Sequence, residues 1–428
     1  MATKYFASVL VAGLFIVAAS PTAVAQSQVL TEPFVVPLQL LSGGNRLGIS
    51  ALIAGGTFAP PVTYVFDTGS PMFVSAYGTT GTTGTQTAAW WGPQGSFTLT
   101  GSSGTIPFTG GGGYAYDLVN VAVTLSSTAG ASLTTGSSYS VAQCTQHFYN
   151  GKPQTEWLAQ SPPSGTVPPL QYTFYGTFGA DLTDPTNGLY GFVNQFQTGT
   201  GITTGFVVDA TSASPTLTLG LDQSVKSRFS NVVPMVAGTN GGFMKNIVNS
   251  NFSFTGTTVA SSTTFSAVPT LFDTGTPGSM VIYTGSAMPL PSEFQSLQDF
   301  TVQFSLGDVT WSVSSPDITV TSATDGVGGI TLGLPFFQNY AVMYDVGNGN
   351  IGFAAAAVPE PSTLLLAASG LGAALLARRR RGAAAGIAGL ARDTCAVTHG
   401  ATSSISIRRY RAPSLRDARA RWTSGSIA

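Results

Sequence analysis

Between residues 26 and 357, the apolar positions of the chain come in short runs separated by polar turns. The runs are rich in Val, Phe and Thr, and they are bounded by Gly, Pro or Asn. Short runs of β-branched and aromatic residues between turn formers are typical of strands. No sustained helical period appears in this span. The pattern therefore predicts an all-β fold with many turns.

A longer apolar stretch lies near the start of the chain. It runs from Phe6 to Ala19, follows Lys4, and is followed by the small residues Ala23–Ala25. A positive charge, an apolar segment and a small-residue site are typical of a secretory signal peptide. We therefore expect residues 1–25 to be a signal peptide, with cleavage before Gln26.

A second apolar stretch, Thr363–Ala377, follows Val358–Ser362 and precedes the arginines Arg378–Arg381. It is slightly shorter than the ~20 residues that a helix needs to span a bilayer. This Pro-Glu-Pro, apolar and arginine order resembles the PEP-CTERM sorting tail of Gram-negative bacteria. The resemblance implies processing by an exosortase-type enzyme, attachment to the membrane before processing, and a cell-surface or extracellular location. An ordinary stop-transfer anchor is the alternative.

A five-residue phrase occurs twice in the chain, as Phe66–Ser70 and as Phe272–Thr276. Each copy ends an apolar run and carries Asp-Thr-Gly followed by a hydroxyl residue. An acidic group at the end of a buried strand is costly unless it is hydrogen-bonded or shares its charge. Two copies suggest two similar lobes that each place one carboxylate, Asp67 and Asp273, at a common cleft. A single Asp-Thr-Gly could simply be a tight turn, which is the alternative for each copy.

Two carboxylates that lie together would share one proton. At about 3 Å and an effective dielectric constant of about 20, full charges would repel by roughly 5 kcal/mol, or about 4 pKa units. The ionised partner can draw a proton from a water, and the protonated partner can donate to a carbonyl oxygen. This chemistry requires no covalent intermediate, no metal and no cofactor.

The chain resembles the pepsin-like aspartic proteases over about residues 47–353. The resemblance rests on both Asp-Thr-Gly motifs and on four further segments, namely Gly176–Ala180, Thr216–Asp222, Ile330–Asp345 and Ile351–Phe353. It implies a two-lobed all-β fold with the active site between the lobes. It also implies that Asp67 and Asp273 are the catalytic pair.

The same resemblance implies roles for the neighbours of the two acids. Hydrogen bonds across the lobe interface are expected from Thr68 and Thr274. Backbone amides are expected from Gly69 and Gly275, and bonds to the outer carboxylate oxygens from Ser70 and Thr276.

The chain departs from the family pattern at two places. The first motif is usually followed by Trp, whereas here the run is Pro71–Val74. The family also closes its cleft with a hairpin flap that carries a Tyr. The corresponding hairpin has Phe108 at that position and four glycines at the tip, so Phe108 and Tyr114 are the flap candidates, with Tyr116 as a further substitute.

Charge and cysteine content narrow the possible functions. Only 8% of the residues are charged, and residues 26–357 carry five basic against fifteen acidic side chains. An acidic body with few cations argues against nucleic-acid binding, and it fits activity at low pH, which we state as a hypothesis. Cys144 and Cys395 are too few for a disulfide framework. Cys144 and His147 alone do not make a metal site.

The predicted organisation is a signal peptide (1–25), an N-terminal lobe (26–220), a C-terminal lobe (221–357), a sorting signal (358–381) and a disordered tail (382–428). The leading function is a secreted or surface-sorted aspartic endopeptidase acting on extended peptides. One alternative is a non-catalytic surface or biofilm-matrix binding protein with the same fold. A structural β-rich matrix protein is another, although it leaves the paired motifs unexplained.

Overall fold

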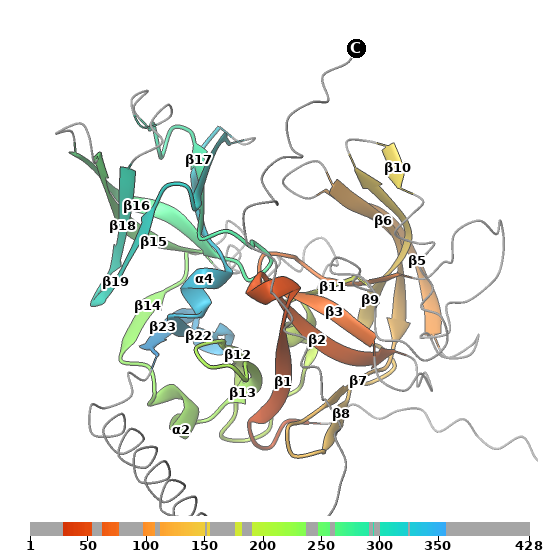
Figure 1. The fold of residues 1–428 in the computed structure, drawn as a ribbon. Coiled ribbons are helices and arrows are strands. Elements are labelled where there is room, and N and C mark those ends of the chain that lie inside the picture. The colour runs from red at the N-terminus through yellow and green to blue at the C-terminus, as the bar shows by residue number, and fades with distance from the viewer. Residues whose placement is uncertain are drawn as a thin grey trace, which may run out of the picture. The chain divides into compact units, whose positions relative to one another are not determined.

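The computed structural model describes twelve stretches of the chain (Figure 1), namely residues 29–53, 62–76, 97–107, 112–149, 152–154, 176–181, 191–236, 247–256, 262–290, 294, 300–323 and 326–356. The chain divides into two compact units, Met1–Ala357 and Val358–Ala428. The predicted signal peptide, sorting signal and tail lie outside the described residues. Within the described residues, no helix has the length and apolar character needed to cross a membrane.

Most of the described residues lie in strands, which confirms the predicted all-β class. One sheet contains β1 (Phe34–Leu41), β2 (Arg46–Ile53), β3 (Val62–Asp67), β4 (Phe73–Ala76), β5 (Phe97–Pro107), β6 (Gly112–Val121), β7 (Val123–Ser126), β8 (Ser132–Thr134), β9 (Ser140–Tyr149), β10 (Lys152–Gln154), β11 (Gly176–Gly179), β12 (Thr203–Asp209), β13 (Thr216–Leu221), β14 (Asn231–Pro234), β22 (Tyr340–Asp345) and β23 (Asn350–Ala355).

A second sheet is built from the later half of the chain. It contains β15 (Ile247–Gly256), β16 (Ser262–Phe272), β17 (Met280–Thr284), β18 (Phe300–Leu306), β19 (Val309–Ser314), β20 (Ile318–Ser322) and β21 (Gly329–Leu332). The described helices are single turns, namely α2 (Gln223–Lys226), α4 (Leu334–Phe337), η1 (Ser42–Gly44), η3 (Phe192–Gln195) and η4 (Val346–Asn348). These short turns agree with the absence of a helical period in the sequence.

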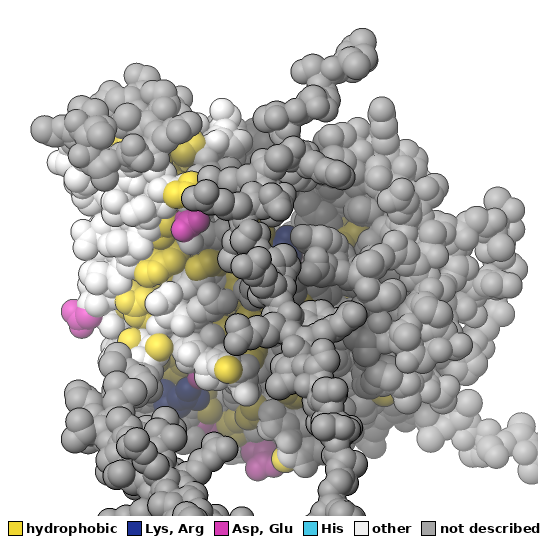
Figure 2. Space-filling model, viewed as in Figure 1, with side chains coloured by type: hydrophobic (Ala, Val, Ile, Leu, Met, Phe, Trp, Pro, Cys, Tyr) yellow, Lys and Arg dark blue, Asp and Glu magenta, His cyan; other side chains and the backbone are white. Residues whose placement is uncertain are grey.

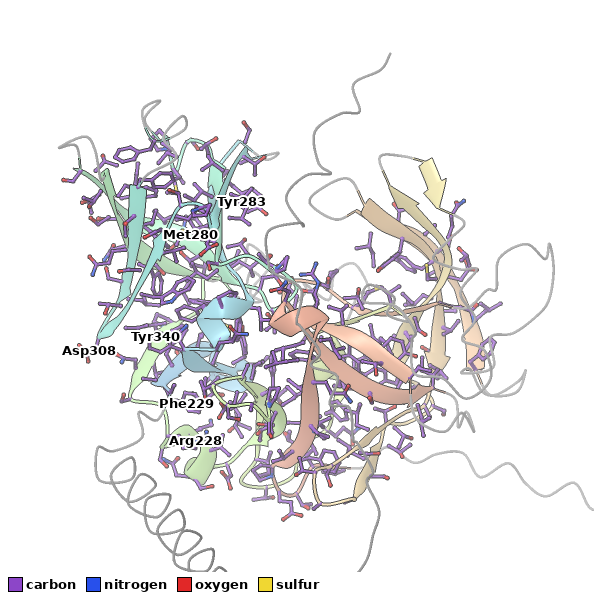
Figure 3. The ribbon with its side chains drawn as sticks, in the orientation of Figure 1. Arg228, Phe229, Met280, Tyr283, Asp308 and Tyr340 are labelled. Carbon is purple, nitrogen blue, oxygen red and sulfur yellow. The ribbon has the colours of Figure 1, made fainter. Side chains whose placement is uncertain are left out.

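Strands from both halves of the chain meet in one part of the first sheet. The order there is β14-β23-β22-β12-β13-β1 (Figure 1), so the last two strands pair beside strands from the middle of the chain. β12 joins the two halves because it pairs with β13 on one side and with β22 on the other. Nearby, the Tyr340 hydroxyl donates to the Thr310 carbonyl at 2.7 Å, which ties β22 to β19 of the second sheet (Figure 3).

The chain uses one strand arrangement twice, once around each Asp-Thr-Gly motif. In the first copy β11 lies between β3, to which it is parallel, and β4, to which it is antiparallel. In the second copy β21 lies in the same way between β16 and β17. A strand from later in the chain therefore threads between the two strands that flank each loop. The segments that the sequence matched to such strands, Gly176–Ala180 and Ile330–Gly333, lie at these positions.

Aromatic side chains pack beneath both loops. Phe66, the residue before Asp67, packs on Phe178 of β11 with ring centroids 6.1 Å apart. Phe272, the residue before Asp273, packs on Phe336 at 5.1 Å and on Phe353 at 5.0 Å. Phe66, Phe178, Phe272 and Phe336 are fully buried. Because protein interiors are close-packed, these aromatic contacts fix the position of each strand end and of the Asp that it carries.

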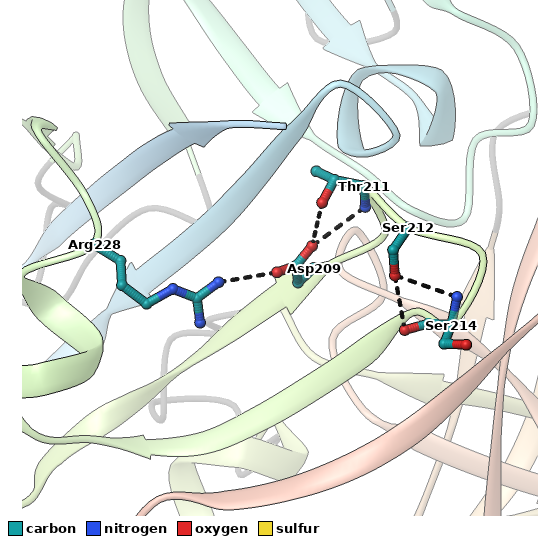
Figure 4. A network of polar contacts seen from close by, with 5 residues as sticks. All are labelled: Asp209, Thr211, Ser212, Ser214 and Arg228. Atoms are coloured by element: carbon teal, nitrogen blue, oxygen red, sulfur yellow. Dashed lines mark hydrogen bonds and ion pairs between the residues drawn. The ribbon is translucent and has the colours of Figure 1, made fainter. Parts of the chain in front are cut away.

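Charged side chains on the described surface are few and scattered, as the composition implies (Figure 2). A surface cluster at the β12–β13 turn shows how such a charge is held (Figure 4). Asp209 accepts from Arg228 at 3.0 Å and from the Thr211 hydroxyl at 2.6 Å. The Arg228 guanidinium is half exposed, so this pair contributes little to stability.

Candidate active site

The two motif acids come together although they lie 206 positions apart in the sequence. Asp67 is the last residue of β3, and Asp273 directly follows β16. Their side chains lie close together, because the Gly69 amide donates to Asp67 and a Cβ on Gly69 would lie only 2.7 Å from Asp273 Cγ. Backbone hydrogen bonds hold the main chain of both acids, because Ala180 N donates to Asp67 O at 2.8 Å and Asp273 N donates to Leu332 O at 2.9 Å.

Two threonines join the loops through four crossed hydrogen bonds. The Thr68 hydroxyl donates to Phe272 O at 2.8 Å and accepts from Thr274 N at 3.0 Å. The Thr274 hydroxyl donates to Phe66 O at 2.8 Å and accepts from Thr68 N at 3.1 Å. Both threonines are fully buried. Each loop therefore satisfies backbone groups of the other, which holds the two acids in register.

Each carboxylate also receives two bonds from its own loop. Asp67 accepts from Gly69 N at 2.8 Å and from the Ser70 hydroxyl at 2.6 Å. Asp273 accepts from Gly275 N at 2.7 Å and from the Thr276 hydroxyl at 2.6 Å. All eight sequence-predicted residues of the two motifs thus meet at one place, with equivalent bonding on both sides.

Glycine is required in both loops because the opposite acid lies against its Cα. A Cβ on Gly69 would lie 2.7 Å from Asp273 Cγ, and one on Gly275 would lie 2.4 Å from Asp67 Cγ. Real Cβ atoms do not approach other atoms this closely, so any larger residue would push the acids apart. The missing side chains are what permits the two carboxylates to meet.

The threaded strands need glycine for a similar reason. A Cβ on Gly179 would lie 2.6 Å from Ser70 O, and one on Gly333 would lie 2.6 Å from Thr276 O. Each strand thus runs directly beneath the peptide that carries the hydroxyl donor of its loop. Because this strand supports the loop from the core side, the loop keeps its position, and the carboxylates stay where the two halves of the chain meet.

Burial raises the pKa of Asp67 well above its ordinary value, and the charge of Asp273 and its hydrogen bond raise it further. The donors Ser70 and Gly69 oppose this change because they favour the ionised form. Desolvation has the larger effect, so Asp67 holds a proton at a pH where an exposed Asp would have lost it. One group of the pair is therefore available as an acid.

Two further residues contact the motif loops and were not predicted from the sequence. Arg46, the first residue of β2, donates from Nη1 to Gly275 O at 2.9 Å. Tyr344 donates to Phe272 O at 3.3 Å, and burial raises its pKa well above the ordinary value. Sequence distance hides both contacts. The sequence offers one weak indication for Arg46, because it is one of only five basic residues between positions 26 and 357.

The flap candidates have different outcomes. Phe108 lies outside the described residues. Tyr114 lies on β6, where its hydroxyl is 3.4 Å from the Thr177 hydroxyl of β11. Burial raises the pKa of Tyr114 to about 12, with smaller contributions from Thr177, which lowers it, and from Cys144 and Asp67, which raise it. Tyr116 lies on the same face in a small apolar cluster with Met72 and Cys144. Tyr114 therefore lies beside the threaded strand, within electrostatic reach of Asp67.

Cys144 is a buried free thiol whose pKa is raised to about 12 by burial. The side chain of His147 is outside the described part of the chain. Among the described residues, no group of three or more His, Cys, Asp or Glu side chains could hold a metal ion.

Residues 357–381 match the PEP-CTERM protein-sorting motif. The match includes the Pro-Glu-Pro segment, the apolar run and the four arginines. A PEP-CTERM motif indicates export and sorting toward the cell surface in Gram-negative bacteria. The chain therefore carries the sorting motif that its sequence resembled.

The chain is also similar in structure to proteins whose structures have been solved. One is an aspartic proteinase from Irpex lacteus, with 16% identity, 78% of this chain and 100% of that chain covered, and a TM-score of 0.45. Another is Basic 7S globulin from soybean, with 11% identity, coverage of 76% and 95%, and a TM-score of 0.43. No curated protein matches the sequence.

Proposed function

We propose that this chain is an exported aspartic endopeptidase in which Asp67 and Asp273 activate a water molecule. The observation that carries the proposal is the pair itself. Two carboxylates meet across the interface, each held by two donors, and the loops are locked by four buried hydrogen bonds. A structural turn would need neither the pairing nor the glycines that permit it.

The raised pKa of Asp67 supports its role as the acid. In the proposed reaction, water attacks the peptide carbonyl carbon and gives a proton to ionised Asp273, while Asp67 protonates the carbonyl oxygen. The resulting diol collapses as Asp273 passes its proton to the amide nitrogen and the C–N bond breaks. A diol hydroxyl returns its proton to Asp67. The pair again holds one proton, and the products are a carboxylic acid and an amine.

The substrate class that we propose is an extended peptide or protein segment. A backbone laid beside sheet edges can bind by main-chain hydrogen bonds, which leaves side-chain preference to the pockets around it. Tyr114 and Thr177 place two hydroxyls beside the Asp67 loop.

Substitution of either acid tests the proposal. Purified protein is incubated with a library of extended peptides from pH 3 to pH 7, and cleavage is followed by mass spectrometry. Asp67→Asn and Asp273→Asn should each lower turnover by about 10²- to 10⁴-fold, the usual contribution of a positioned acid or base. Asp209→Asn is the matched control, since Asp209 lies in the surface cluster of Figure 4 and should leave turnover unchanged.

Retention of activity in both motif variants would overturn the assignment. An inactive wild-type protein that still retains pepstatin-like transition-state mimics would point to a non-catalytic binding protein with the same pair.

We also propose that an exosortase-type enzyme processes the tail after the apolar run Thr363–Ala377 has entered the inner membrane. The matched motif supports this sequence of events. Arginines at the end of an apolar segment favour the cytoplasmic side. Replacing Pro359-Glu360-Pro361 by alanines should leave an unprocessed, membrane-retained form, which cell fractionation detects. Unchanged release would contradict the proposed processing.

A further inference from the structure

Arg46 is a cation built into the contact between the two halves of the chain. It opens β2 of the first sheet, yet its Nη1 donates to Gly275 O of the second motif at 2.9 Å, across 229 residues of sequence. A second, longer bond joins Nη1 to Asn45 O at 3.5 Å. The Gly275 amide donates to Asp273, so Arg46 bonds the residue that holds this acid.

The guanidinium also acts on the charges of the pair. Burial lowers the pKa of Arg46, whereas the charges of Asp67 and Asp273 raise it. Arginine stays cationic throughout the range in which carboxylates titrate. Since a Coulomb interaction is mutual, a positive charge that both acids stabilise must favour their ionised forms in return.

The other titratable groups around the pair come from three elements. Tyr114 of β6 interacts with Asp67, and Tyr344 of β22 interacts with Asp273 and with Asp181 at the end of β11. Both tyrosines are neutral in acid because burial raises their pKa values. Asp181 is a buried acid and can only add negative charge. Among these groups, Arg46 is therefore the one that carries a positive charge near the two acids.

Two other cations in the described part of the chain are engaged elsewhere. Lys226 pairs with Asp345 at 2.9 Å, and Arg228 pairs with Asp209 at 3.0 Å. Neither pair includes a motif residue. Arg228 consequently offers a matched arginine outside the site.

We propose that Arg46 is a positioning residue that holds the Gly275 peptide and stabilises the singly ionised state of the Asp67–Asp273 pair, which moves the working range of the enzyme to lower pH. The proposal rests on the proposed peptidase function. It adds a determinant that lies outside both Asp-Thr-Gly motifs.

Charge and hydrogen bonding can be separated with two substitutions. Arg46→Gln removes the charge but keeps an uncharged N–H donor at this position. Arg46→Lys keeps the charge but loses the planar fork. The pH dependence of kcat/KM is measured for both variants, for the wild-type protein and for Arg228→Gln, with circular dichroism at each pH to verify folding.

The expected result is a displacement of the whole pH profile. Loss of the cation disfavours both ionisations of the pair, so the acidic and alkaline limbs of Arg46→Gln should both move up, by about one pH unit. Arg46→Lys should keep the wild-type limbs and lose turnover, and Arg228→Gln should match the wild-type protein. Unmoved limbs in Arg46→Gln, or an equal displacement in Arg46→Lys, would overturn the proposal. A merely structural role would lower turnover without moving the limbs.

A measurement without substrate separates this inference from the peptidase assignment. Carbon NMR of ¹³C-labelled aspartate carboxyls, assigned with Asp67→Asn, follows the titration of Asp67 directly. If the wild-type protein cleaves no peptide, an upward displacement of this titration in Arg46→Gln still supports the role of Arg46, while the peptidase proposal fails. An unchanged titration overturns the role of Arg46 whether or not peptides are cleaved. If Arg46→Gln does not fold, the test rests on Arg46→Lys, which keeps the charge. A pH profile and an Asp67 titration that stay at their wild-type pH values support a charge effect of Arg46. A displacement of either in Arg46→Lys refutes it.

Discussion

The crossed threonine bonds can be tested by removing one hydroxyl at a time. Thr68→Val replaces the hydroxyl by a methyl group of similar size, so packing is preserved while its bonds to Phe272 O and Thr274 N and its contact with the Tyr344 hydroxyl disappear. The Phe272 carbonyl loses its 2.8 Å donor but keeps the Tyr344 hydroxyl at 3.3 Å. The Thr274 amide loses its 3.0 Å acceptor in a fully buried place.

These losses set the expected magnitude. A buried hydrogen bond contributes about 1 kcal/mol net, and an unsatisfied buried amide adds about 1–3 kcal/mol. With the carbonyl partly compensated, Thr68→Val should lower the free energy of unfolding by about 2–4 kcal/mol. Thr274→Val removes the equivalent bonds to Phe66 O and Thr68 N and should cost about the same.

The double variant shows whether the bonds act as one unit. Since both hydroxyls hold the same interface, the second substitution should cost less than the first, and the pair should deviate from additivity by about 1 kcal/mol or more. Urea unfolding followed by intrinsic fluorescence measures each value. Thr124→Val is the matched control, because its hydroxyl bonds Thr134 at 3.0 Å on a half-buried ladder and should cost less than about 1 kcal/mol. Single effects as small as the control, or full additivity, would refute the interlocked interface.

Two further predictions concern the pair itself. Gly69→Ala should abolish peptide cleavage because its Cβ would lie 2.7 Å from Asp273 Cγ, whereas Gly278→Ala, which has nothing within 4 Å, should retain cleavage; equal activities would contradict the steric argument. The raised pKa of Asp67 also predicts how stability depends on pH. The folded protein binds this proton more tightly than the unfolded chain, so the stabilisation is complete below the unfolded pKa of about 3.9 and is lost as pH rises through the folded pKa, at up to about 1.4 kcal/mol per pH unit. Thermal unfolding at a series of pH values should show this loss of stability in the wild-type protein but not in Asp67→Asn. The same pH dependence in both proteins would contradict a raised pKa of Asp67.

The parts of the fold that the sequence predicts are those with a local pattern. Asp-Thr-Gly at the end of an apolar run specifies a strand, a tight loop and a buried acid within five residues. Its repetition suggests that the two loops meet. Gly179 ends β11 and Gly333 directly follows β21, and both lie beneath a loop carbonyl that leaves no room for a side chain. Here pattern and packing impose the same residue, so the prediction is reliable.

Contacts between distant segments leave no such mark. Arg46 carries a polar side chain at a strand start, which by itself is typical of an exposed position. Nothing near it in the sequence indicates a bond to Gly275. Alternation along β6 places Tyr114 and Tyr116 on one face, but only the structure shows that Thr177 of β11 faces the Tyr114 hydroxyl. The partner lies on a strand that reaches this place by threading, which a local pattern does not encode.

The two loops are so alike that their own bonds do not decide which acid holds the proton. The glycine donors lie at 2.8 and 2.7 Å, and both hydroxyl donors lie at 2.6 Å. The difference must come from groups outside the repeat. Arg46 bonds the second loop through Gly275 O, and its charge interacts with both acids, with Asp67 more than with Asp273. The cation therefore favours the ionised form of Asp67 as well, whereas the burial of Asp67 favours its neutral form. Because the pKa of Asp67 is raised overall, its burial outweighs the cation, and the assignment of Asp67 as the acid follows from its burial and not from Arg46.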